Sequence, residues 1–197
     1  MKTVNTLRTL GRHLAAFTLI ELLVVISIIA ILASLALPAI TGALVKGQII
    51  QTVSNYRQLY VLTQSATLDS QTAGGSGAFP GDVTNSISAW SNALVPAYCS
   101  SNTFSSLGYV KGHGANTTVW NVKSTDDPST IFLSTAGIAG NPPTNITMSV
   151  SGPYAAKGGA FVTIAGSAVS LTGTNSPILT NNSAQLSTNG TNQFSGS

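Results

Sequence analysis

The chain has little charge and almost no cysteine. Only 7% of its 197 residues are charged, with 8 Lys and Arg against 5 Asp and Glu. Cys99 is the only cysteine, which excludes a disulfide within the chain, and we expect it to be a small buried hydrophobe rather than a reactive thiol. A nucleic-acid-binding surface needs clustered Lys and Arg, and those that follow residue 17 are scattered. Composition therefore gives no case for nucleic-acid binding.

The basic residues are unevenly placed along the chain. Lys2, Arg8 and Arg12 precede a long apolar run, and the charges after them cancel. Basic residues that flank a membrane span on one side hold that side in the cytoplasm. We therefore expect a single-pass inner-membrane protein with a cytoplasmic N-terminus and the rest of the chain outside the cytoplasm.

The apolar run covers residues 17–37 and contains one carboxylate, Glu21, near its start. A helix needs roughly 20 apolar residues to cross a bilayer core, whereas the apolar part of a cleaved secretory signal has about 7–15. The length therefore predicts a membrane-spanning helix. Glu21 is the residue to explain, because an ionisable group inside a span is a functional candidate by default.

The residues around the start of this run resemble the type IV prepilin and pseudopilin signal. Ala16 is followed by Phe-Thr-Leu-Ile-Glu and then by a charge-free apolar stretch. The resemblance implies that residues 1–16 are a leader, removed by a prepilin peptidase between Ala16 and Phe17, and that the new amine of Phe17 is methylated. The family usually has glycine before the cut, so with Ala16 we expect slower cleavage or a more tolerant peptidase.

Glu21 has a specific role under this interpretation. Cleavage would create a free amine on Phe17, close to the carboxylate, and an unpaired charge in hydrocarbon is costly. The resemblance implies a salt bridge between the Glu21 carboxylate of one subunit and the Phe17 amine of its neighbour. Such a pair would set the axial register of a filament, as a single buried polar residue does in other helix assemblies.

We expect one helix from about Phe17 to Leu68, kinked at Pro38. Proline removes a helical hydrogen bond and Gly42 weakens the next turn, so these two residues form a candidate hinge. Residues 38–71 are predicted to be an amphipathic continuation. Its apolar stripe comprises Ile49, Val53, Tyr56, Tyr60 and Thr63, flanked by Ile50, Leu59, Leu62 and Ala66.

The remainder is predicted to be a β-rich globular domain, residues 72–172, and a flexible polar tail, residues 173–197. Glycines in 73–77 end the helix. The clearest strand signal is a β-hairpin over 160–172, where apolar residues alternate on both sides of a Gly-Ser turn. Trp90, Trp120 and Tyr109 are expected to be core anchors. Weaker candidates for short strands or turns are residues 87–90, 94–98, 117–122 and 130–133.

No residue pattern predicts catalysis, a metal site or a cofactor. His113 lies in a glycine-rich stretch without a nucleophile motif. Asp126 and Asp127 supply far fewer than the six to eight oxygen ligands that calcium needs, so a solvated turn is favoured.

The predicted fold is therefore α+β: the second half of a long N-terminal helix packs on a small antiparallel sheet. The predicted function is a structural subunit of a type IV pilus-like or type II secretion pseudopilus filament, with prepilin peptidase, other pilin or pseudopilin subunits and the membrane as partners. The assembled filament would be periplasmic or on the cell surface. The alternative is a membrane-anchored binding or adhesin domain that does not polymerise. An exported hydrolase has no support beyond isolated Ser, His and Asp residues.

Overall fold

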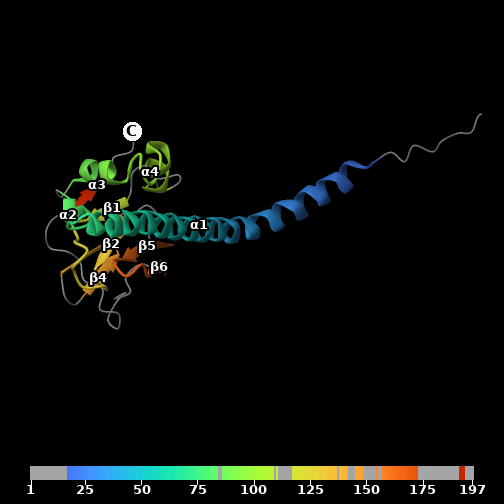
Figure 1. The fold of residues 1–197 in the computed structure, drawn as a ribbon. Helices are drawn as coiled ribbons and strands as arrows, with labels where there is room; N and C mark the ends of the chain where they lie inside the picture. The colour runs from blue at the N-terminus through green and yellow to red at the C-terminus, as the bar shows by residue number, and fades with distance from the viewer. Residues whose placement is uncertain are drawn as a thin grey trace, which may run out of the picture. The chain divides into compact units, whose positions relative to one another are not determined.

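The computed structural model divides the chain into two compact units, residues 1–41 and residues 42–197 (Figure 1). The described residues are 17–83, 86–108, 110, 117–136, 138–141, 145–148, 154, 157–172 and 191–193.

Helix α1 runs from Leu19 to Thr72, a length of 54 residues, and is the longest element of the chain. The predicted helix is confirmed, with the end four residues later than expected. The helix continues without a break through Pro38. Its C-terminus is a Schellman motif: Gly74 has a φ of 85°, its N–H donates to Gln71, and Gly75 N–H donates to Ser70.

Within the second unit, one face of α1 is buried against the domain. Its apolar members are Ile49 and Tyr56 of the predicted stripe, and Leu59 and Ala66, which were predicted to flank it. Ile50, predicted to flank that stripe, is instead 62% exposed.

Four hydroxyl groups lie on the same buried face, and we call them the hydroxyl seam: Thr52, Tyr56, Thr63 and Thr67. Each one bonds to a different part of the domain, because a buried hydroxyl without a partner is costly. Thr52 meets the Tyr154 hydroxyl at 2.5 Å, and the Tyr56 hydroxyl meets that of Thr117 at 2.9 Å. Thr63 accepts from the Trp90 indole at 3.1 Å, and Thr67 accepts from the Ala78 N–H at 3.1 Å.

Among the described residues after α1 there are three short helices: α2 (Pro80–Val83), α3 (Ile87–Leu94) and α4 (Ser101–Gly108). The strand or turn expected at residues 87–90 is therefore wrong, because Ser86 caps a helix there by accepting from the Ala89 N–H at 3.0 Å. Residues 94–98 were expected to be a strand or a turn, and residues 95–98 form a turn after α3.

The main sheet is antiparallel throughout and has the strand order β6-β5-β2-β1-β7. Figure 1 shows α1 running between the α3–α4 region and strands β2, β5 and β6. The predicted α+β architecture is confirmed. The strands are β1 (Thr117–Trp120), β2 (Ile131–Thr135), β5 (Gly158–Thr163), β6 (Ala168–Thr172) and β7 (Thr191–Gln193), with β3 (Ile138–Asn141) and β4 (Asn145–Met148) in a separate two-stranded sheet.

The hairpin predicted over residues 160–172 is present as β5 and β6. Val162 pairs with Ala168, and Thr163 N–H donates to the Ser167 carbonyl at 3.0 Å. Gly166 has a φ of 79°, which an L side chain rarely adopts. Of the tail predicted for residues 173–197, β7 pairs with β1, and the rest lies outside the described residues.

An aromatic cluster joins the short helices to the sheet. Trp90 packs edge-to-face on Phe104 of α4 and on Phe132 of β2, with ring centroids 5.0 and 5.4 Å apart, and Phe79 packs on Phe132 at 5.0 Å. Trp90 and Trp120 are buried, which confirms both as core anchors. Tyr109 lies outside the described residues. Cys99 was expected to be buried but is half-buried, because it lies on the loop after α3.

Candidate functional site

The first turn of α1 is held by two side chains that point at each other. The Glu21 carboxylate accepts from the Thr18 N–H at 2.9 Å and from the Thr18 hydroxyl at 2.7 Å. In return, the Thr18 hydroxyl lies 3.3 Å from the Glu21 N–H. This reciprocal pairing is a capping box, which satisfies N–H groups that have no partner within the helix.

Thr18 is a site residue that we did not predict from the sequence. Its signal was readable, because a threonine followed three residues later by glutamate and then by an apolar run is typical of a capping box. The capping box also explains how a carboxylate is tolerated at the start of this apolar helix. Glu21 is hydrogen-bonded and lies where the helix dipole favours a negative charge.

Among the described residues of the first unit, 17–41, the other hydroxyl groups are bonded inside their own helix. Ser27 donates to the Leu23 carbonyl at 2.7 Å, and Ser34 donates to the Ile31 carbonyl at 2.8 Å. Such bonds leave no hydroxyl in need of water. The helix surface between Leu22 and Leu37 is therefore compatible with a hydrocarbon surrounding.

Every residue from 17 to 41 is exposed, including the large apolar side chains. An 18-residue window of α1 has a mean hydropathy of 2.8, and none of it is buried. By length and composition, this helix can cross a membrane. So large an exposed apolar surface needs lipid or protein against it.

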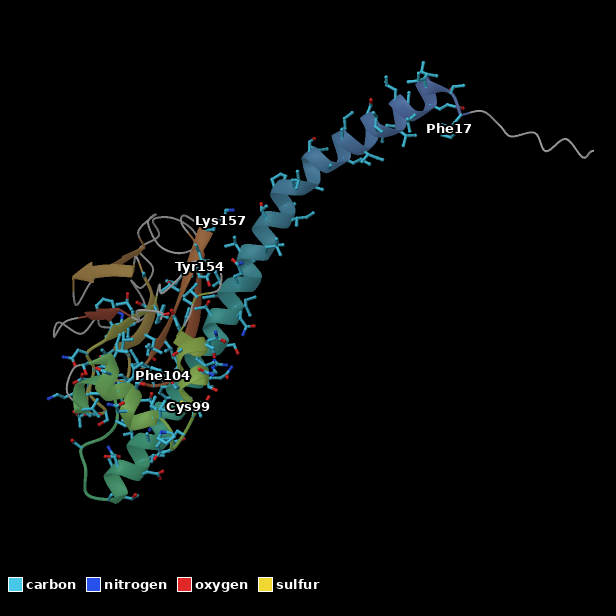
Figure 2. The ribbon with its side chains drawn as sticks, turned by 90° about the horizontal axis from the view of Figure 1, so that it is seen from above. Phe17, Cys99, Phe104, Tyr154 and Lys157 are labelled. Atoms are coloured by element: carbon cyan, nitrogen blue, oxygen red, sulfur yellow. The ribbon has the colours of Figure 1, made fainter. Side chains whose placement is uncertain are left out.

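The structure describes Phe17, Pro38 and Gly42 among the other predicted site residues, but not Ala16. Phe17 is 73% exposed at the residue before the cap, so the start of the run is accessible (Figure 2). Ala16 and the leader lie outside the described residues. Pro38 and Gly42 both lie within α1, and a Cβ at Gly42 would meet nothing within 4 Å. Their role as a hinge stays a prediction.

The other acidic candidates are bonded within a surface turn. Asp126 accepts from the Lys123 N–H at 2.8 Å, and Asp127 accepts from the Ser129 N–H at 2.8 Å. The Ser129 hydroxyl and N–H together lower the pKa of Asp127. In the part of the chain that the structure describes, no three His, Cys, Asp or Glu side chains gather as metal ligands. His113 lies outside that part.

Comparison with known proteins finds one family signature. Residues 12–37 match the model of the prokaryotic N-terminal methylation motif. This match covers the residues on both sides of the Ala16–Phe17 bond, the capping box and the exposed apolar helix. No curated protein and no solved structure matches the chain.

A prepilin-type signal followed by an exposed apolar helix fits a membrane-anchored protein. The match stops near the point where the first unit ends, so it identifies the signal and not the domain. The chain carries the prokaryotic N-terminal methylation motif, which is the prepilin signal of type IV pilins and pseudopilins.

Proposed function

We propose that the chain is a structural, non-enzymatic subunit of a type IV pilus-like or type II secretion pseudopilus filament, and that it polymerises through the first half of α1. The observation that carries the proposal is the methylation motif at residues 12–37. The wholly exposed apolar helix supports it, because a subunit that moves from lipid into a filament core needs an apolar surface in both settings.

The proposed maturation has three steps. The basic leader keeps the N-terminus in the cytoplasm while the apolar helix enters the membrane. A prepilin peptidase then cuts between Ala16 and Phe17, and the Phe17 amine is methylated. Finally, other subunits take up the helix by head-to-tail contacts, which generate an open filament.

Glu21 is proposed to pair with the Phe17 amine of a neighbouring subunit. In the full-length chain, Phe17 carries an amide, and both bonds that Glu21 accepts come from Thr18. Only one carboxylate oxygen makes these bonds, so the other oxygen can accept from an incoming amine without loss of the cap.

Processing is tested by expressing the full chain with and without its cognate prepilin peptidase and measuring the intact mass. We expect a chain that begins with N-methylated Phe17 when the peptidase is present and one that begins at Met1 when it is absent. A chain that still begins at Met1 with active peptidase, or that has lost the apolar run, would contradict the proposal.

Assembly is tested with Glu21→Gln, which removes the charge but keeps a side chain that can form a capping box. We expect normal membrane insertion and processing but loss of surface or periplasmic filaments. Thr18→Ala is the matched control, because it removes the cap and leaves the charge. If Glu21→Gln forms filaments like the wild type, the register role fails. If neither the wild type nor Glu21→Gln forms filaments, the chain is an anchored binding or adhesin domain instead.

A further inference from the structure

A surface groove lies in the second unit between the exposed side of α1 and the segment from the end of α3 into α4. Its volume is about 570 Å³. Cys99, labelled in Figure 2, lies on the segment that forms one wall. Pockets that hold compact organic ligands measure about 300–1,000 Å³, so this groove has the size of such a site.

The lining combines one cation with an apolar surface. Arg57 is the only charged residue among those that line the groove, and Gln58 lies beside it on α1. Leu62 of α1 and Leu107 of α4 supply aliphatic surface, while Tyr98 supplies an aromatic ring. A ligand in this groove would therefore contact both a positive charge and an apolar surface.

Arg57 is available to such a ligand. It is exposed, and it makes no ion pair or hydrogen bond to any of the described residues. Tyr98, which lines the opposite wall, donates its hydroxyl to the Asp69 carboxylate of α1 at 2.6 Å. The same bond ties the loop that carries Cys99 to α1, so that the wall of the groove is in place before a ligand arrives.

We propose that this groove binds a small organic acid with one carboxylate on an apolar body. Arginine presents paired N–H donors that match a carboxylate, which fixes the charged end of the ligand at Arg57. The apolar body would lie against Leu62 and Leu107 and remove their surfaces from water. The site does not depend on filament assembly, because every residue that lines it belongs to the second unit of one chain.

The chain provides its own reporter of occupancy, because Cys99 is the only cysteine and lines the groove. Partial burial raises the pKa of its thiol, so alkylation should be followed at about pH 8. The experiment measures the rate at which N-ethylmaleimide labels the full-length chain in detergent, with 4-phenylbutyrate or its neutral analogue 4-phenylbutanol present. We expect the acid to slow labelling at concentrations where the alcohol has little effect.

Three variants locate the interaction. Arg57→Gln should require about tenfold more acid for the same protection, and Arg57→Lys should recover part of the difference. Lys46→Gln is the matched control, since Lys46 is an exposed cation of the same helix that does not line the groove. It should behave like the wild type.

Three results would overturn the proposal. They are no protection by the acid, equal protection by the acid and the alcohol, and protection that Arg57→Gln leaves unchanged. Because Arg57 is exposed, its replacement should leave the fold intact, which circular dichroism of each variant would verify.

Discussion

The indole N–H of Trp90 on α3 donates to the hydroxyl of Thr63 on α1 at 3.1 Å, and both residues are fully buried. The same hydroxyl donates to the Leu59 carbonyl at 2.9 Å, so its proton and a lone pair are both used. One threonine thereby links the long helix to the aromatic cluster of the domain.

Thr63→Val should lower the free energy of unfolding of the domain. The valine has nearly the same shape, but the Trp90 indole loses this acceptor, and a buried donor that loses its acceptor costs about 1–3 kcal/mol. Denaturant unfolding followed by Trp fluorescence would measure the change. Ser65→Ala is the control, because Ser65 also donates to a helix carbonyl but is exposed. Equal stability of the two variants would mean that the Trp90–Thr63 bond contributes nothing.

Thr18→Ala should loosen the first turn of α1 without affecting the domain. Loss of a threonine cap costs about 0.5–2 kcal/mol of helix stability. Amide hydrogen exchange of the detergent-solubilised chain should therefore speed up at residues 19–22 and stay constant in the sheet. Ser27→Ala, which removes a hydroxyl from the same helix but no cap, should leave this exchange unchanged. Equal exchange rates at residues 19–22 in the wild type, Thr18→Ala and Ser27→Ala would argue against the capping box.

Gly166→Ala and Gly47→Ala should have opposite effects on stability. At Gly166, the φ of 79° strains an alanine by about 1–2 kcal/mol, and the new Cβ would meet the Tyr60 ring. At Gly47, a Cβ meets nothing within 4 Å, and alanine is about 1 kcal/mol better than glycine inside a helix. Denaturant midpoints of the two variants would check both signs, and a gain in stability from Gly166→Ala would contradict the hairpin geometry.

The domain should lose stability in alkaline solution. The bond to Asp69 raises the pKa of Tyr98, and burial raises the pKa of Tyr154 and Tyr56. The unfolded chain releases these protons near the ordinary tyrosine pKa of about 10, so above that pH it binds fewer protons than the folded chain. The stabilising contribution is therefore complete below about pH 10 and is lost as the pH rises through the raised pKa values.

Urea unfolding at about pH 8, 10 and 11 would measure this loss. Tyr98→Phe removes one of the three titrating groups, so its stability should decline less steeply with pH than that of the wild type. An identical decline in both proteins would mean that the Asp69 carboxylate does not hold the Tyr98 proton.

The long helix could be predicted because its signals are local. Fourteen large apolar residues in 17–37, a 3- and 4-residue repeat after Ile49 and the glycines after Thr72 each act over a few neighbouring residues. The same holds for the β5–β6 hairpin, in which the strands adjoin their turn. The prepilin signal is also a continuous stretch, which is why Phe17 and Glu21 could be named from the sequence.

The predictions from sequence failed where serine and threonine are compatible with more than one structure. Ser86 starts α3 and Ser100 accepts from the Thr103 N–H at 3.2 Å ahead of α4, although serine-rich sequence is equally typical of loops. Thr52 could not be predicted as buried, since its partner Tyr154 is 102 residues away. The groove at Arg57 was likewise not predictable, because its second wall comes from residues 98–107.

The hydroxyl seam gives α1 a single position on the domain. Apolar contacts alone tolerate a helix that slides or rotates slightly, because burial has little directional preference. Thr52, Tyr56, Thr63 and Thr67 each need a partner at a fixed distance, and a shift of one turn, about 5.4 Å, would separate all four pairs together. A pulling force applied along the helix axis should therefore meet a cooperative rupture of these pairs rather than gradual slippage.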